Sequence, residues 1–253
     1  MAYGVDAGRD DSQPAILVFD LGGGTFDVSL LQSFDGILEV VASEGDDALG
    51  GLDADLLIAD ALLERAALSP PQAAAVRACE RSRAALQRAA EAVKIALSDA
   101  EAHTARLVLP AAGCDVEVTI ARSELDATLT PFLRRLWDPL QRLGEAYKLE
   151  WAAYPFGGSP ASGASAADRF APPPRRVSQL VLVGGGTRAP AVRAFAEAVA
   201  GVRACVGVNP EHCVALGAAL HAGFMEGAVV GGLEMTDGVY VQELQQRVSG
   251  FQM

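Results

Sequence analysis

The sequence is poor in cysteine, histidine and aromatic residues, and this scarcity excludes several kinds of site. Its four cysteines form no CxxC pair, and its three histidines have no zinc-ligand spacing. We therefore interpret the cysteines as reduced, structural thiols. His212 beside Cys213 is the one pairing that suggests a metal or a thiol catalyst. We expect Cys213 instead to face the core, from a helix that begins at Asn209-Pro210.

Long hydrophobic runs and clusters of basic residues are also missing. No run of about 18 or more strongly apolar residues is present, so that neither a membrane anchor nor a membrane partner is expected. The amino terminus lacks the basic and apolar regions of a secretory signal, which predicts an intracellular, cytoplasmic protein and leaves an organelle open. The net charge of −12, with basic groupings no longer than pairs, argues against nucleic acid as a partner.

The order of predicted strands and helices is that of an α/β sheet with an insertion. Short turns join the first three strands, which indicates an antiparallel meander. Helices and strands alternate after it, as in a ribonuclease-H-like fold. Strands are predicted at 16–20, 26–31, 37–42, 105–109, 115–120 and 179–183, and helices begin near 53, 72, 123, 138, 190 and 210.

Local signals predict where the helices begin and break. Ser69-Pro70-Pro71 is expected to close the first helix, and one long helix is expected to follow over 72–97, where neither Gly nor Pro occurs. Ser123 is expected to cap the helix that follows the second pair of strands. Pro131 should interrupt that helix, and Asp138-Pro139 should restart it.

These segments predict a divided chain. Residues 1–68 and 122–226 are expected to form a ribonuclease-H-like lobe, and residues 69–121 an inserted subdomain of helices and strands. Residues 152–176 are rich in Gly, Ser, Ala and Pro, which is typical of a flexible insertion. Residues 227–253 are expected to be a tail that ends in a short partner-binding segment.

The most informative segment is DLGGGTFD at 20–27, which lies between the first two predicted strands. Glycine lets backbone N–H groups approach an anion, because no Cβ blocks the way. A strand follows these glycines, whereas a dinucleotide fingerprint opens a helix. Asp20 and Asp27 suit phosphate only if a cation such as hydrated Mg²⁺ lies between, and Thr25 can orient a water or a phosphate oxygen. A glycine-rich hairpin turn with structural carboxylates is the alternative.

Two weaker signals lie further along the chain. The segment VGGGTRAP at 183–190 runs from a strand into a helix, where N–H groups and Arg188 can meet an anion or an adenine face. Close packing of a strand–helix turn is the alternative. Glu91, Lys94 and Ser98 lie on one side of the long helix, where a solvated ion pair is the usual explanation.

Together these segments resemble the 70-kDa heat-shock chaperone family, in order, from Ala2 to about Gly223. They are similar to its second phosphate loop, the start of its inserted subdomain, its adenosine-contacting helix, its adenosine loop and its final helix. The matching segments are DLGGGTFDVS at 20–29, ALGGLDADL at 48–56, EAVKIALS at 91–98, LVLVGGGTRAPAV at 180–192 and VNPEHCVALGAAL at 208–220. The resemblance implies the second half of an actin-like ATPase domain, with a ribonuclease-H-like α/β fold.

The resemblance also implies a site for ATP or ADP with Mg²⁺. Asp20 and Asp27 would serve the cation shell, and Thr25 would lie near the attacking water. The residues that would meet the β- and γ-phosphates are Gly22, Gly23, Gly24 and Thr25. The residues that would contact ribose and adenine are Glu91, Lys94, Ser98, Gly185, Gly186 and Arg188.

Several departures from the family accompany this resemblance. Ile95 often corresponds to a basic residue that stacks on adenine, Gly186 to Ser or Gln, and Glu211 to Asp. The family's first phosphate hairpin, its catalytic lysine and glutamate, and its client-binding domain have no counterpart in this sequence. We therefore expect weak or no ATP hydrolysis by this chain alone, with another protein or the missing lobe as partner. A non-enzymatic interaction scaffold and a truncated product of a full chaperone are the alternatives.

Overall fold

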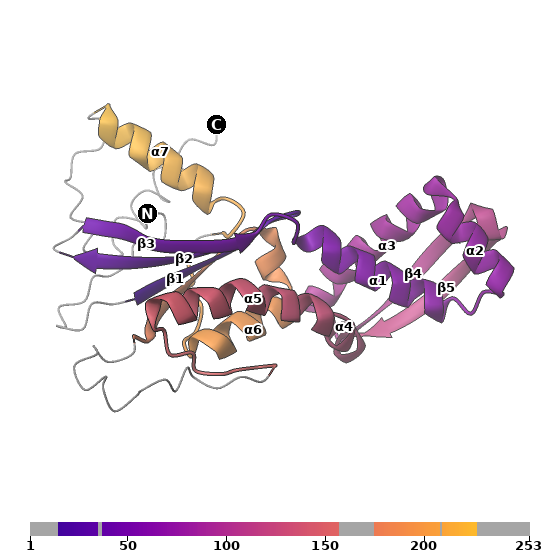
Figure 1. The fold of residues 1–253 in the computed structure, drawn as a ribbon. Helices are drawn as coiled ribbons and strands as arrows, with labels where there is room; N and C mark the ends of the chain where they lie inside the picture. The colour runs from indigo at the N-terminus through magenta and orange to yellow at the C-terminus, as the bar shows by residue number, and fades with distance from the viewer. Residues whose placement is uncertain (1–14, 35–36, 157–174, 208, 227–253) are drawn as a thin grey trace.

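The computed structural model describes residues 15–34, 37–156, 175–207 and 209–226 (Figure 1). A four-stranded sheet with helices on both faces occupies one end of the molecule, and a two-stranded hairpin with its own helices occupies the other. The elements, in chain order, are β1 (Ala15–Leu21), β2 (Phe26–Phe34), β3 (Ile37–Asp46), α1 (Gly51–Arg65), α2 (Pro70–Ala78), α3 (Glu80–Asp99), β4 (Ala102–Leu109), η1 (Pro110–Ala112), β5 (Cys114–Ala121), α4 (Arg122–Thr128), α5 (Thr130–Tyr147), β6 (Val177–Val183), η2 (Gly185–Arg188), α6 (Pro190–Ala200) and α7 (Cys213–Met225).

The larger sheet has the order β3-β2-β1-β6. β1 to β3 form the predicted antiparallel meander, and β6 lies parallel to β1. With the separate β4-β5 hairpin, this arrangement confirms the predicted mixed α/β fold. β3 continues to Asp46, four residues beyond its predicted end at Ala42, because Gly45 lies opposite Asp27 and packs closely on β2. A Cβ at Gly45 would lie 2.7 Å from the carbonyl oxygen of Phe26.

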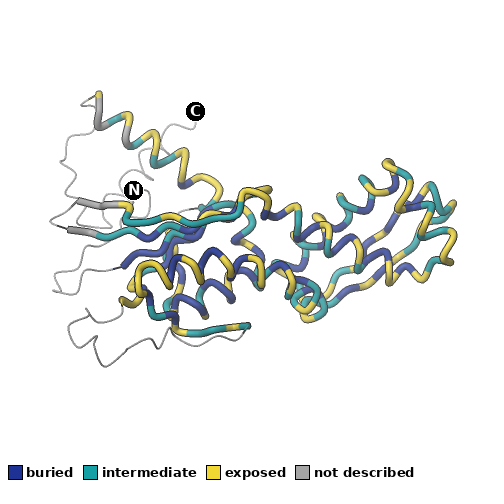
Figure 2. The backbone as a smooth tube through the Cα atoms, in the orientation of Figure 1, coloured by how far each residue is buried: buried dark blue, intermediate teal, exposed yellow. Residues whose placement is uncertain are grey.

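The core is one cluster of buried side chains that includes residues of the sheet and of the hairpin end. Figure 2 shows buried residues along the backbone at both ends of the molecule. α5 and α6 lie on one face of the sheet and α7 lies on the other (Figure 1). Leu17, Phe19 and Leu21 of β1 belong to the main cluster, and each buried side chain of this size stabilises the fold by about 1.5–3 kcal/mol. Cys213 packs in a smaller cluster with Ile16, so that its predicted core-facing position is confirmed.

Two predictions about helix ends were wrong. The expected long helix over 72–97 is divided at Cys79, which has extended dihedral angles of φ −92° and ψ 115° between α2 and α3. Ser69 does not close the first helix, which ends at Arg65. Instead Ser69 begins α2, where its N–H and its hydroxyl both donate to Gln72 Oε1. A proline in the first helical turn loses no intrahelical hydrogen bond, so that Pro70 starts a helix as readily as it stops one.

The helices that follow β5 also begin differently from the prediction. Glu124 rather than Ser123 provides the cap of α4, because its carboxylate accepts a hydrogen bond of 2.8 Å from the N–H of Ala121. The predicted break near Pro131 is confirmed, because α5 begins at Thr130. The predicted restart at Pro139 is wrong, because this proline lies buried inside α5. Packing of the apolar face of α5 outweighs the cost of about 3 kcal/mol for an internal proline.

The flanks of the expected flexible insertion contact the core, which the sequence did not indicate. Ala152 N–H donates to Val199 O over 2.9 Å, and Arg175 pairs through its backbone with Lys148 and Glu150. Residues 157–174 lie outside the described residues, as does the predicted tail at 227–253. None of the described helices combines the length and the hydrophobicity that a membrane-spanning helix needs.

Candidate functional site

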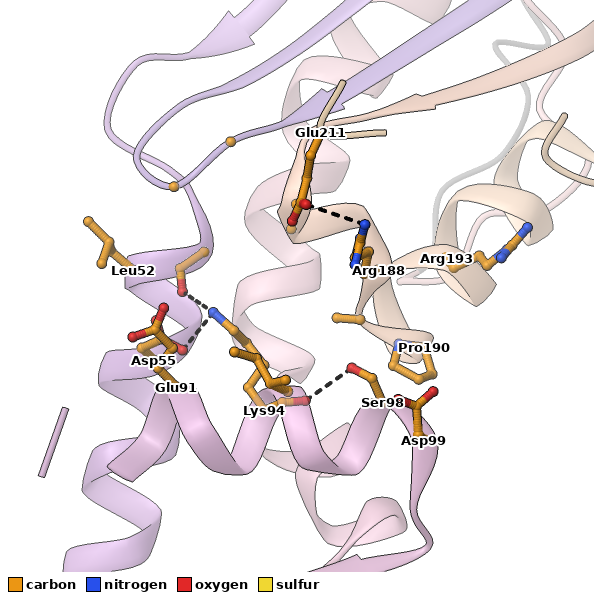
Figure 3. A pocket seen from close by; sticks show the side chains of 17 residues that line it. Leu52, Asp55, Glu91, Lys94, Ser98, Asp99, Arg188, Pro190, Arg193 and Glu211 are labelled. Carbon is orange, nitrogen blue, oxygen red and sulfur yellow. Dashed lines mark hydrogen bonds and ion pairs between the residues drawn. The ribbon is translucent and has the colours of Figure 1, made fainter. Parts of the chain in front are cut away.

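A pocket of about 670 Å³ lies where α1, α3, η2 and the turn between β1 and β2 meet (Figure 3). It brings together many of the residues that the sequence singled out. The predicted site residues that line it are Gly22, Gly23, Glu91, Lys94, Ser98, Gly185, Gly186 and Arg188. Gly24, Thr25, Asp20 and Asp27 do not belong to its lining.

The glycine loop, residues 22–25, is held from behind by the start of α1. The N–H of Gly22 donates to Thr25 O over 3.0 Å, which closes the turn. The N–H groups of Gly51 and Leu52 donate to the carbonyl oxygens of Gly22 and Gly23, each over 2.9 Å. Two of the N–H groups that a helix leaves unpaired at its first turn are thus used to position the loop.

The close approach between the loop and α1 requires a glycine at position 50. A Cβ there would lie 2.4 Å from backbone atoms of both Gly23 and Gly24. Gly23 itself is exposed, and a Cβ on it would meet nothing within 4 Å. The loop is therefore packed on one side and open on the other.

Asp20 and Asp27 lie directly opposite one another on β1 and β2, beside the glycine loop. Like charges in this register are destabilising. Burial first, and the neighbouring charge of Asp27 second, raise the pKa of Asp20. No cluster of three or more His, Cys, Asp or Glu side chains within the described ranges could hold a metal ion. The two carboxylates would fit a hydrated divalent cation that takes its other ligands from water and a bound anion.

Lys94 of α3 meets Asp55 of α1 at the wall of the pocket (Figure 3). Its Nζ lies 2.7 Å from Asp55 Oδ1 and donates to Gly51 O over 3.2 Å. The side chain of Asp55 is 2% exposed and that of Lys94 is 17% exposed. Burial raises the pKa of Asp55, the charge and hydrogen bonding of Lys94 oppose this rise, and Glu91 adds to it. The positive charge of Lys94 beside the glycine loop is therefore offset by the negative charge of Asp55.

Ser98 and Glu91 lie one turn to either side of Lys94. The hydroxyl of Ser98 donates to Lys94 O over 3.1 Å, which is a bond within the helix. Glu91 lies exposed on the same wall. The three residues thus share one face of α3, as predicted. Lys94, however, forms its ion pair with Asp55 of α1 and is not part of a solvated ion pair on its own helix.

The facing wall is built on Arg188 (Figure 3). Its guanidinium donates to Asn209 Oδ1 over 2.8 Å and lies 3.3 Å from Glu211 Oε2. The N–H of Gly184 donates to Pro210 O over 3.0 Å. Gly184 has φ +81°, and a Cβ on it would lie 2.3 Å from Leu21 O, so that this turn also requires glycine. These contacts join η2 to the turn that precedes α7.

The sequence matches the family model described as Hsp70 protein over residues 1–150 and 173–247. The chain belongs to the Hsp70 family. It is 37% identical over 236 residues to the chaperone protein DnaK 1 of Synechococcus sp., which covers 90% of this chain and 27% of that relative. It is 36% identical over 234 residues to DnaK of Trichormus variabilis, with coverage of 90% and 30%. The chain therefore spans less than a third of the length of these relatives.

Gly186, which the resemblance marked as a departure from the family, packs closely on β1. A Cβ at Gly186 would lie 2.7 Å from Leu21 Cγ and 2.9 Å from Leu21 O. A Ser or Gln at this position would therefore displace β1 or the Leu21 side chain. Ile95 and Leu52 line the same pocket and are 61% and 53% exposed, so that the wall of this Hsp70 chain has an apolar surface there.

Sequence reasoning missed some residues that build this Hsp70 pocket. Asp55 and Gly50 lie in the segment ALGGLDADL, which was assigned only to the start of the inserted subdomain. Asp99 and Arg193 also line the pocket. The pairing of Asp55 with Lys94 joins two helices, and no local pattern in either helix predicts it.

Proposed function

We propose that this chain is the second lobe of the Hsp70 ATPase domain, and that its pocket binds ATP or ADP with Mg²⁺. The observation that carries this proposal is the convergence of the glycine loop, the α3 face and η2 on one pocket. Gly22 and Gly23 would face the phosphates, Lys94 and Ser98 the ribose, and Arg188 the base. Residues 1–68 and 122–226 would form the lobe, with 69–121 as its inserted subdomain.

Asp20 and Asp27 would hold the hydrated cation beside the phosphates. Mg²⁺ in nucleotide sites is held by one or two carboxylates together with water and phosphate oxygens, and it supplies charge neutralisation there. The position of Asp20 directly opposite Asp27 on the neighbouring strand supports this role, because a bound cation would offset the repulsion between the two carboxylates. Thr25, at the end of the glycine loop, would position a phosphate oxygen or the attacking water.

We further propose that these 253 residues alone hydrolyse ATP weakly. Phosphoryl transfer depends on positive charge placed around the developing negative charge. The cationic side chains that line the described pocket are already engaged by carboxylates: Lys94 by Asp55, Arg188 by Glu211 and Arg193 by Glu197. Partner groups from outside these residues would have to supply the rest of the stabilisation.

Calorimetric titration with Mg-ADP and Mg-ATP tests the binding proposal. We expect saturable binding with a Kd in the micromolar range, about −8 kcal/mol. Absence of binding by a chain that circular dichroism shows to be folded would contradict it. That result would favour a second candidate, a non-enzymatic interaction scaffold, which the exposed Ile95 and Leu52 support.

Thr25→Ala tests the hydrolysis proposal. Because Thr25 is exposed and does not line the pocket, its role would be mainly in the hydrolysis step, and removal of its side chain is expected to change the Kd for Mg-ADP by no more than about threefold. Phosphate release by the wild-type chain and by the variant should both stay near background. Rapid hydrolysis by the wild-type chain that Thr25→Ala abolishes would contradict the proposal, because the chain would then be a complete ATPase.

A further inference from the structure

Arg135 of α5 lies outside the pocket, yet its contacts lead to the glycine loop. We propose that Arg135 is a positioning residue that holds residues 46–53 against this loop and thereby sets the affinity for the phosphate groups of the nucleotide. The proposal rests on the proposed nucleotide site. A measurement without ligand, described below, separates its failure from failure of that site.

The guanidinium of Arg135 holds three separate groups of one short segment. It donates to Asp53 Oδ1 and to Asp46 Oδ2, each over 3.1 Å, and to Ala48 O over 2.8 Å. A planar, rigid fork can engage several acceptors at once, which a flexible ammonium does less well. Arg135 therefore fixes both ends of the connection between β3 and α1.

The same segment carries the contacts that hold the glycine loop. Asp53, which Arg135 binds through Oδ1, accepts a hydrogen bond from Gly50 N through Oδ2 over 2.8 Å. Gly50 packs on Gly23 so closely that no Cβ fits, and Gly51 N–H donates to Gly22 O. Because Gly50 and Gly23 are already in close contact, a shift of residues 46–53 would also move the glycine loop.

Charge provides a second reason for an arginine at this position. Asp46 and Asp53 lie close to a loop that would bind phosphates, and carboxylates without a counter-charge would repel them. The Ala48 N–H first, and Arg135 in addition, keep the pKa of Asp46 below its usual range, so that this carboxylate is charged. Arg135 compensates both carboxylates with one side chain.

Arg142 is a matched control on the same helix. It lies two helical turns further along α5, and it is half exposed like Arg135. Its guanidinium donates to Glu44 Oε2 over 2.9 Å and to Gly45 O over 3.0 Å, at the end of β3. Among the described residues, its hydrogen bonds and its ion pair go to Glu44 and Gly45 and not to residues 46–53, although its charge also helps to lower the pKa of Asp46. Arg142→Ala therefore removes the same charge and an ion pair to β3, but not the contacts to the segment that holds the loop.

The experiment compares Mg-ADP with adenosine, which lacks phosphates, by calorimetric titration of the wild-type chain, Arg135→Ala, Arg135→Lys and Arg142→Ala. Arg135→Ala should weaken Mg-ADP about tenfold and leave adenosine within about twofold, since the shift of residues 46–53 is passed to the loop that meets the phosphates. Arg135→Lys should give an intermediate loss. An unchanged ADP-to-adenosine ratio in Arg135→Ala, or an equal change in Arg142→Ala, would overturn the proposal.

Amide hydrogen exchange without any ligand gives an independent readout. Arg135→Ala should speed exchange in residues 22–25 and 50–53 at least about fivefold, whereas Arg142→Ala should not. If the Arg135→Ala variant fails to fold, the exchange of Arg135→Lys is compared with that of the wild-type chain instead. If the wild-type chain binds neither ligand, the proposed nucleotide site fails, and the exchange comparison still decides whether Arg135 positions the loop. Unchanged exchange in the folded Arg135 variants would refute the positioning role.

Discussion

Gly23→Val is expected to weaken Mg-ADP binding at least about 100-fold, or about 2.7 kcal/mol, while leaving the folded state intact. Gly23 lies on the open side of the glycine loop, and a Cβ there would meet nothing within 4 Å. The added isopropyl group would therefore occupy space that a phosphate needs for close approach to the backbone, without a clash inside the protein. Calorimetric titration measures the affinity, and thermal unfolding checks that the fold is unchanged.

Gly217→Val is the control for this variant. Gly217 lies on α7 and does not line the pocket, and a Cβ on it would also meet nothing within 4 Å. The Gly217→Val substitution therefore introduces the same side chain at an equally open position. Its affinity for Mg-ADP should stay within about twofold of the wild-type affinity. A Gly23→Val variant that binds like the wild type would mean that nucleotide does not meet the glycine loop.

Lys94→Met is expected to lower the free energy of unfolding by about 3 kcal/mol, because it leaves Asp55 buried without its counter-charge. Methionine keeps much of the apolar stem of the side chain, so that the loss arises mainly from the charge. Urea denaturation at neutral pH measures it. Lys148→Met, at the exposed residue that directly follows α5, is the control, and it should change the stability by less than about 0.5 kcal/mol.

The loss caused by Lys94→Met should also depend on pH. Burial raises the pKa of Asp55 in the folded state, and Lys94 opposes this rise, so that its removal raises the pKa further. A raised folded-state pKa means that stability is lost as pH rises from the unfolded value through the folded one. The difference between variant and wild type should therefore shrink as pH falls toward the folded pKa of Asp55, where this carboxyl becomes neutral. A difference that stays constant across this range would contradict the ion-pair explanation.

Much of the fold could be predicted from the sequence, because strand and helix periodicities are local. The short turns that join the first three strands were enough to predict the antiparallel meander. Helix ends were predicted less well, since Ser69-Pro70 can either end one helix or begin the next. Pro139 can either begin a helix or lie inside one. The buried face of α5, formed by residues from other parts of the chain, decided that Pro139 stays within the helix.

The candidate site divides in the same way. Residues of the glycine loop and of η2 could be named in advance because their glycines are adjacent in the chain and carry a recognisable pattern. Asp55 could not be named in advance, because its role depends on Lys94, which lies far along the chain on a different helix. The glycine at position 50 is explained only by the loop on which it packs.

The sequence by itself determined the Hsp70 family, the mixed α/β fold and the segments that contribute to the pocket, because these follow from local patterns and ordered motifs. Only the tertiary structure decided which charges are compensated and which backbone atoms touch. Arg135 and Asp53, 82 residues apart, meet because α5 packs on the sheet face over β3 and β2. Such contacts depend on the packing of whole elements, and the spacing of residues within one element does not contain that information.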